Sequence, residues 1–239
     1  MTLNLIQRIL SAFTFKKETA AKPDLAFIAQ QLRKPSGDFA PKIAEKMNNS
    51  NETLFDFTLE YVQADNEEKI LEIGFGSGLF FKKIFAYGKS PQVHGIDFSK
   101  EMLDLAGKNN IELINSGKLT LVHGSSDCLP YADNTFDKVY CNMVIYFWED
   151  PSTHLKEIRR VLKPEGSFFT GYRTRESMLG FPFTKHGFIL YEPKEWEDVL
   201  KANNFSVIGS NLRNDPPFES DSKQIELVSV CTASEVVKD

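Results

Sequence analysis

The stretch that most constrains the fold of this chain is KILEIGFGSGLF, residues 69–80. An apolar run interrupted only by Glu72 predicts a short buried strand, and the amphipathic residues after it predict the opening of a helix. The turn between them contains three glycines, Gly74, Gly76 and Gly78. Glycines at alternate positions allow a sharp bend and let a ligand lie directly against the main chain. Because open α/β sheets bind ligands at the carboxyl ends of their strands, this turn is a candidate binding site, with an ordinary strand-to-helix turn as the alternative.

Downstream of this turn, short apolar runs alternate with amphipathic helical patterns. Strands are expected at residues 92–97, 119–123, 136–142, 167–172, 205–211 and 225–231. Ser99 and Asp150 are suited to cap helices, and a further helix is expected at residues 193–203. A loop rich in Pro and Asp is expected between the last two strands. The alternation predicts an α/β fold whose sheet is mainly parallel, with helices on both faces.

The part of the chain before the glycine turn has a helical pattern. Residues 1–65 are expected to form a helical N-terminal cap that belongs to the same domain as residues 66–239. One helix is expected at residues 26–32, and after a Pro-containing loop two more are expected, separated by a polar turn at residues 48–51. Residues 1–17 are amphipathic and predict an accessory helix packed on the domain, with a membrane-surface helix as the alternative, rather than a signal peptide.

Composition excludes several classes of protein. The 239 residues are 41% hydrophobic and carry a net charge of −5, which is typical of a globular protein and argues against broad nucleic-acid binding. The three cysteines lie far apart without CxxC spacing, so neither a disulfide framework, a metal site nor an oxidising compartment is expected. No apolar run is long enough to span a membrane. The expected location is the cytoplasm, and the oligomeric state is left open.

Asp97 ends the second expected strand, 23 residues after Gly74. A carboxylate there can accept hydrogen bonds from the two hydroxyls of a ribose bound over the glycine turn, while the alternative is an Asp that caps a helix. The glycine spacing is GxGxG, whereas the dinucleotide fingerprint is GxGxxG, and Leu79 occupies its third glycine position. The pattern therefore leaves open which adenosine-containing cofactor binds.

Taken in order, these motifs resemble the class I methyltransferases that use S-adenosylmethionine. Glu72 followed by GxGxG resembles their first motif, and GIDFS with Met102 resembles their second. The segment HGSSDCLPYADNTFDKVYCNMVIYF resembles their third and fourth motifs, and EIRRVLKPEGSFF is similar to the helix and strand that follow. The resemblance is good over residues 69–172 and weaker to residue 231. It implies a Rossmann-like fold with a seven-stranded, mostly parallel sheet, and S-adenosylmethionine as cofactor, with S-adenosylhomocysteine as product.

The resemblance also implies a set of cofactor-binding residues. They are Glu72, Gly74, Phe75, Gly76, Gly78, Asp97, Phe98, Met102, Ser125, Ser126, Asp127, Asn142 and Met143. By this comparison, Asp97 would bind the ribose hydroxyls, and Phe98 and Met102 would enclose the adenine. The partner of the adenine amino group is left open between Ser126 and Asp127.

Three further residues in that set have implied positions around the methionine part of the cofactor. Asn142 and Met143 would line the floor beside the sulfonium, and Glu72 would hold the turn and the cationic amino group. Methyl transfer then requires mainly alignment and desolvation, with a general base only when the acceptor arrives protonated. His186 is the one weak candidate for such a base, a loop histidine without a role being the alternative, and the catalytic residues are otherwise unknown.

The acceptor is less constrained. Aromatic residues gather at positions 181–191, which favours a pocket for a small apolar or aromatic molecule, and residues 33–48 are expected to close over the site. Residues 215–218, DPPF, resemble a catalytic motif of amino methyltransferases but follow the wrong strand, and are therefore interpreted as part of a loop. The sequence predicts an enzyme that methylates a small molecule. The alternatives are a protein or RNA acceptor, a non-catalytic S-adenosylmethionine-binding protein, and an NAD(P)-dependent oxidoreductase.

Overall fold

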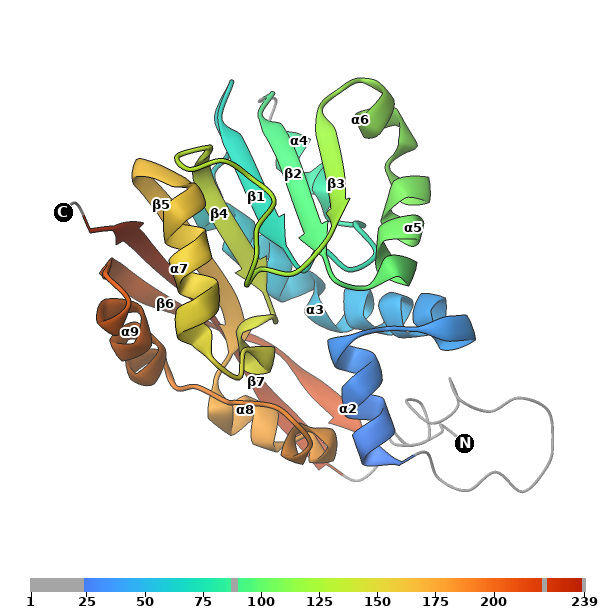
Figure 1. The fold of residues 1–239 in the computed structure, drawn as a ribbon. Helices are drawn as coiled ribbons and strands as arrows, with labels where there is room; N and C mark the ends of the chain where they lie inside the picture. The colour runs from blue at the N-terminus through green and yellow to red at the C-terminus, as the bar shows by residue number, and fades with distance from the viewer. Residues whose placement is uncertain (1–23, 87–89, 221–222, 238–239) are drawn as a thin grey trace.

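The computed structural model describes residues 24–86, 90–220 and 223–237 and contains one sheet of seven strands in the order β3-β2-β1-β4-β5-β7-β6 (Figure 1). The strands are β1 Lys69–Ile73, β2 Gln92–Asp97, β3 Leu119–His123, β4 Phe136–Asn142, β5 Leu162–Arg173, β6 Phe205–Ser220 and β7 Lys223–Val236. Strands β1 to β5 pair in parallel, and β7 lies antiparallel between β5 and β6. The predicted mostly parallel sheet is confirmed. The predicted amphipathic segment at residues 1–17 lies outside the described residues.

Helices cover both faces of the sheet. The helices are α2 Leu25–Arg33, α3 Ala40–Val62, α4 Phe81–Phe85, α5 Lys100–Asn109, α6 Ile111–Asn115, α7 Pro151–Val161, α8 Arg175–Leu179 and α9 Pro193–Ala202. Short 3₁₀ turns occur at residues 37–39, 145–147 and 182–185. Ser99 and Asp150 cap α5 and α7, as predicted, by accepting backbone N–H groups with their side chains. No helix in the described part of the chain is long and apolar enough to cross a membrane.

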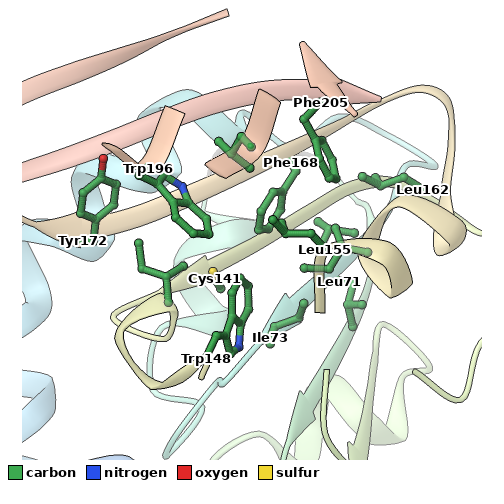
Figure 2. Packing of buried hydrophobic residues seen from close by; sticks show 14 of the residues in the cluster. Leu71, Ile73, Cys141, Trp148, Leu155, Leu162, Phe168, Tyr172, Trp196 and Phe205 are labelled. Carbon is green, nitrogen blue, oxygen red and sulfur yellow. The ribbon is translucent and has the colours of Figure 1, made fainter. Parts of the chain in front are cut away.

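Successive residues of a strand point to opposite faces, so the core has two layers. On one face Leu71 of β1 packs with helices α7 and α9, and on the other Ile70 packs with α3, α4 and α5. Figure 2 shows the first layer, where Trp196 of α9 lies near Phe168 of β5. The indole of Trp196 donates a hydrogen bond of 2.8 Å to Thr170, so this buried polar atom has a partner.

The N-terminal helices differ from the prediction in one respect. The polar turn expected at residues 48–51 is wrong, because α3 runs without interruption from Ala40 to Val62. Buried apolar residues continue at helical spacing on both sides of the polar stretch, and these packing contacts decide the conformation. Asn48 projects from the middle of the helix and bonds to Ser77 next to the glycine turn. The division into a cap and a main domain stays a prediction.

The late strands also differ from the prediction. The loop expected between them is wrong in extent, because β6 and β7 form a long antiparallel hairpin and residues 215–218 lie within β6. The register shifts between Asp215, which is opposite Leu227, and Phe218, which is opposite Ile225. This irregularity accommodates the two prolines, which cannot donate to the ladder, and β6 is an edge strand where prolines are tolerated.

Candidate active site

The glycine turn after β1 is held in a conformation that favours glycine. Gly74, Gly76 and Gly78 have φ angles of +74°, +54° and +66°. A Cβ atom on Gly74 would lie 2.4 Å from Val144, and one on Gly78 would lie 2.8 Å from Ala106, so both positions require glycine for packing. A Cβ atom on Gly76 would have no neighbour within 4 Å. Gly76 therefore presents open backbone to the adjoining space.

The Asp97 carboxylate closes this turn from the end of β2. Its Oδ2 accepts the backbone N–H of Gly76 at 2.8 Å, and its Oδ1 accepts the N–H of Ser99 at 2.9 Å. The side chain is only 6% exposed. Burial raises its pKa to about 6, although the two backbone hydrogen bonds oppose the shift. At neutral pH Asp97 is therefore mainly ionised and able to accept hydrogen bonds from a ligand.

A cavity of about 400 Å³ lies at the carboxyl ends of β1, β2 and β4. Its volume falls within the range of small-molecule and cofactor sites. All the predicted cofactor-binding residues line it except Glu72 and Gly78. Those that do are Gly74, Phe75, Gly76, Asp97, Phe98, Met102, Ser125, Ser126, Asp127, Asn142 and Met143. We call this space the first cavity.

Glu72 and Gly78 lie behind the cavity wall. Glu72 is 2% exposed, and its carboxylate accepts a hydrogen bond of 2.6 Å from the Tyr140 hydroxyl. Burial raises the pKa of Glu72 to about 8; the Tyr140 hydrogen bond opposes this shift, and the charge of Asp97 adds to it. Gly78 packs instead against α5. Both residues thus pack against the protein interior next to the glycine turn and do not line the first cavity.

One end of the first cavity is enclosed by side chains from three segments. Phe98 follows β2, and the Lys34 ammonium lies 5.2 Å from the centre of its ring. Ser126, also in the lining, forms a hydrogen bond of 2.8 Å with His154. The ring of His154 stacks on Trp148 with 4.8 Å between centroids. His154 was predicted to lie on a helix without a catalytic role, and the Asp150 cap of α7 places it one turn into that helix, beside this edge of the sheet.

The N-terminal helices close the first cavity from above. Seven residues from this region contribute to the lining, namely Leu32, Arg33, Pro35, Met47, Asn48, Asn51 and Phe55. The Ser99 hydroxyl donates a hydrogen bond of 2.6 Å to the carbonyl of Pro35, which ties this region to the start of α5. Asn48 donates a hydrogen bond of 2.9 Å to Ser77. The segment at residues 33–48 therefore covers the cavity.

A second cavity of about 360 Å³ adjoins the first. The two cavities share Leu32, Met47, Asn51, Met143 and Phe147 as a common wall. Aromatic rings supply much of the remaining surface, from Tyr146, Phe181, Phe183, Phe188 and Phe218. We call this space the second cavity.

His186 does not belong to either lining. Phe183 and Phe188, on each side of it, line the second cavity, whereas His186 is exposed. The chain bends between these aromatic residues, and Gly187 adopts a φ of +77°. Among the described residues no group of three or more His, Cys, Asp or Glu side chains is arranged to hold a metal ion.

Comparison with known proteins decides the family. Residues 71–170 match the model of a methyltransferase domain. The methyltransferase YdaC of Bacillus subtilis (strain 168) is 30% identical over 131 residues, which cover 55% of this chain and 70% of that protein. The chain belongs to the class I S-adenosylmethionine-dependent methyltransferases. This methyltransferase is also 37% identical over 106 residues to a demethylmenaquinone methyltransferase of Bacillus mycoides (strain KBAB4), but it spans only 43% of that protein's length.

Solved structures agree with the fold of this methyltransferase. A structure of the Haloferax volcanii Trm112 methyltransferase activator in complex with a methyltransferase matches with a TM-score of 0.72, covering 84% of this chain and 95% of that one at 19% identity. Phosphoethanolamine N-methyltransferase 2 of Haemonchus contortus, solved with phosphomonomethylethanolamine and S-adenosylhomocysteine, matches with a TM-score of 0.60. That match covers 80% of this chain and 53% of that one at 18% identity. At these identities the comparisons establish the fold alone.

The described residues of this methyltransferase fit its cofactor. The open backbone at Gly76 and the ionised Asp97 suit a ribose, and the apolar surfaces of Phe98 and Met102 suit an adenine ring. Asn142 is buried at the tip of β4, and its Nδ2 has no hydrogen-bond partner among the described residues. Its Oδ1 accepts a hydrogen bond of 2.6 Å from Thr58 of α3. The Nδ2 group of Asn142 is therefore available to donate a hydrogen bond to a ligand in the first cavity.

Proposed function

We propose that this enzyme transfers the methyl group of S-adenosylmethionine to a small, largely apolar acceptor bound in the second cavity. The observation that carries this proposal is the wall that the two cavities share, to which Met143 and Phe147 both contribute. Direct transfer requires the nucleophile to lie behind the methyl group, with the reacting atoms about 3–3.5 Å apart. Two adjoining cavities at the tip of β4 support this arrangement, with the cofactor in the first and the acceptor in the second.

The cofactor-binding roles form part of the proposal. S-adenosylmethionine supplies an activated methyl group, so the protein contributes mainly binding and orientation. Asp97 would accept hydrogen bonds from the ribose hydroxyls, while Phe98 and Met102 would enclose the adenine. Ser126 and Asp127 remain joint candidates for the adenine amino group, since both line the first cavity. Asn142 and Met143 would lie beside the methionine.

Several features favour a small molecule over a macromolecule. The second cavity is covered by α2, α3 and the aromatic segment around residues 181–188, so its lining offers room for a compact acceptor. The net charge of −5 is unfavourable for RNA. One of the relatives is named for a small molecule, demethylmenaquinone.

A labelling experiment tests the acceptor class. The protein is incubated with S-adenosylmethionine carrying a tritiated methyl group and with a cell extract separated into small-molecule, protein and RNA fractions. We expect label only in the small-molecule fraction, and we expect the Asp97→Ala variant to abolish it. Label in protein or RNA would contradict the proposal. Binding of S-adenosylhomocysteine without any labelled product would favour the non-catalytic alternative.

A binding experiment distinguishes the proposed methyltransferase from the remaining alternative, an NAD(P)-dependent oxidoreductase. S-adenosylhomocysteine is expected to raise the melting temperature, because a ligand present at about 100 times its dissociation constant stabilises a fold by roughly 2.7 kcal/mol. NADH and NADPH at the same concentrations should leave the melting temperature unchanged. A shift produced by the nicotinamide cofactors alone would favour an oxidoreductase.

A further inference from the structure

The last residue of β5, Arg173, brings a buried charge to the second cavity. The strand ends at the same edge of the sheet as β1, β2 and β4, and Arg173 lines the second cavity although it is only 3% exposed. An arginine in a cavity with this many aromatic rings is costly to bury unless it has hydrogen-bond partners. The N–H groups of Arg173 that have no partner in the described part of the protein therefore indicate what kind of ligand the cavity binds.

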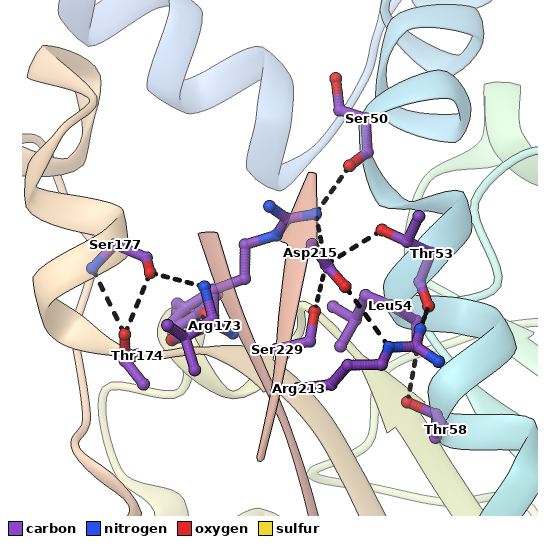
Figure 3. Close-up of polar contacts among 12 residues, drawn as sticks. Ser50, Thr53, Leu54, Thr58, Arg173, Thr174, Ser177, Arg213, Asp215 and Ser229 are labelled. Atoms are coloured by element: carbon purple, nitrogen blue, oxygen red, sulfur yellow. Dashed lines mark hydrogen bonds and ion pairs between the residues drawn. The ribbon is translucent and has the colours of Figure 1, made fainter. Parts of the chain in front are cut away.

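Polar contacts fix the guanidinium of Arg173 from one side (Figure 3). Its Nη2 donates a hydrogen bond of 2.8 Å to the carbonyl of Ser50 in α3 and lies 3.5 Å from the Asp215 carboxylate in β6. Both contacts use this one nitrogen. Among the described residues, neither Nε nor Nη1 has a hydrogen-bond acceptor. These N–H groups remain available to a molecule in the cavity.

Hydrogen bonds to one oxygen hold the Asp215 carboxylate in place behind Arg173. Its Oδ2 accepts hydrogen bonds of 2.9 Å from Thr53 and 2.5 Å from Ser229, and its Oδ1 lies 3.5 Å from Arg213. The carboxylate is 6% exposed and does not belong to the cavity lining. It therefore orients the guanidinium from the far side. The DPPF segment thus has a structural role, that of holding this carboxylate at the bend in β6.

The backbone of Arg173 is fixed as firmly as its side chain. The hydroxyl of Tyr146 accepts the N–H of Arg173 at 2.6 Å and donates to its carbonyl at 2.8 Å. Both residues line the second cavity. Because the protein itself supplies these contacts, folding largely sets the orientation of the guanidinium, which favours tight binding of whatever it meets.

The charged side chains in the described lining of the second cavity have one sign, although the Asp215 carboxylate lies behind Arg173. The charged side chains in its described lining are Lys46 and Arg173, and this lining contains no Asp or Glu. From this charge pattern and the available N–H groups of Arg173, we infer that the methyl acceptor is an aromatic or other apolar molecule carrying an anionic oxygen, a carboxylate or phenolate, that binds to Arg173. The inference rests on the proposed function and names its substrate class.

An anionic acceptor also agrees with the absence of a base from the described lining. Apart from Lys46 and Arg173, the titratable group there is Tyr146, and burial holds the pKa of its hydroxyl far above its usual range. The Tyr146 hydroxyl therefore stays protonated near neutral pH and does not act as a base. An acceptor bound as an anion beside a guanidinium either carries an ionised nucleophile already or is anchored by its acid group while another atom is methylated.

Matched neutral and anionic probes test the inference. Wild-type protein is saturated with S-adenosylhomocysteine and titrated by calorimetry with 2-naphthoate and with 2-naphthamide, which share a ring system and differ in charge. We expect 2-naphthoate to bind at least tenfold more tightly. In Arg173→Gln this preference should disappear, with 2-naphthamide affinity changing less than threefold. In Arg173→Lys part of the preference should remain.

Two control variants localise the effect. Arg213 contacts the same Asp215 carboxylate but lies outside the lining of the second cavity. The Arg213→Gln variant should therefore keep the preference for 2-naphthoate. Lys46→Gln removes the other cation and should reduce the preference less than Arg173→Gln does. Should Arg173→Gln fail to fold, the wild-type comparison and Arg173→Lys still decide the matter.

The possible failures are distinguishable. Equal binding of the two probes, binding of neither, or a preference that survives in Arg173→Gln would each overturn the anion site while leaving the methyltransferase assignment intact. Absence of S-adenosylhomocysteine binding would overturn the proposed function and this inference with it.

Discussion

The Asp97 carboxylate accepts the backbone N–H of Gly76 at 2.8 Å, so the end of β2 is bonded directly to the glycine turn after β1. One side chain therefore shapes the turn and borders the first cavity at the same time. An amide retains one acceptor, enough for the N–H of Gly76 or of Ser99 but not for both, and it loses the negative charge that favours hydroxyl donors.

The Asp97→Asn variant should fold and lose cofactor affinity. Hydrogen bonds to a charged group contribute about 1.5–3 kcal/mol each, so we expect S-adenosylhomocysteine to bind roughly 10- to 100-fold more weakly in calorimetric titrations. Asp104→Asn, which removes an exposed carboxylate of α5, is the control and should bind normally. Unchanged affinity in Asp97→Asn would show that this carboxylate does not hold the ribose.

Substitution of Gly76 should affect binding more than folding. Gly76 and Gly117 both have positive φ angles, +54° and +72°, and a Cβ atom on either would meet nothing within 4 Å. Alanine at each should cost about 1 kcal/mol of stability through the backbone conformation alone. Only Gly76 lines the first cavity, so only Gly76→Ala should weaken S-adenosylhomocysteine binding, by tenfold or more. Equal affinities of the two variants would contradict the proposed site.

Glu72 should make the protein less stable as the pH rises. Its pKa is raised from 4.5 to about 8 in the folded state, so between these values the folded protein binds more protons than the unfolded chain. The stabilisation is full below pH 4.5 and is lost as the pH rises toward 8. Asp97, with its pKa raised from 3.8 to about 6, contributes in the same direction over a lower range.

The Glu72→Gln variant tests this pH dependence. Glutamine keeps an acceptor for the Tyr140 hydroxyl but does not titrate. Urea unfolding at pH 5 and pH 8.5 should show a smaller loss of stability in this variant than in wild type, by an amount on the order of a few kcal/mol. Glu112→Gln, at an exposed position of α6, should behave like wild type. Parallel pH profiles for wild type and Glu72→Gln would refute the assignment.

Gly171 should tolerate no side chain. A Cβ atom there would lie 1.8 Å from Oδ1 of Asn142 and 2.3 Å from the hydroxyl of Thr58. Gly171→Ala should therefore destabilise the fold by about 1–3 kcal/mol and displace Asn142 from the first cavity. Gly209→Ala, in β6 with no atom within 4 Å of its Cβ, should be close to neutral. Both variants are compared by melting curves and by S-adenosylhomocysteine titrations. Equal melting temperatures and equal affinities would contradict the role given to Gly171.

Much of the fold was predictable because its signals are local. The strands containing Glu72, Asp97 and Asn142 were predicted with the boundaries that the structure has or nearly so, since each is a short apolar run bounded by turn residues. Ser99 and Asp150 were recognised as caps because capping depends on one side chain and the N–H groups next to it. Such features require no knowledge of distant contacts.

The failures have tertiary causes. Four polar residues in the middle of α3 indicated a turn, but burial of the apolar residues on either side keeps the helix continuous. The prolines of β6 indicated a loop, but pairing with β7 continues past them through a register shift. Arg173 was missed altogether, although an arginine directly after a predicted strand, at the same edge as Asp97 and Asn142, was a signal that could have found it.

The uninterrupted course of α3 has a consequence for how this enzyme can diversify. Asn48 and Phe55 of this one rod line the first cavity, while Lys46 and Ser50 line the second. Met47 and Asn51 of the same helix line both cavities, so a substitution at either position is expected to change the binding of both ligands. The aromatic segment at residues 181–188 lines the second cavity alone. New acceptor specificities are thus expected to arise by drift in that segment, while α3 changes slowly.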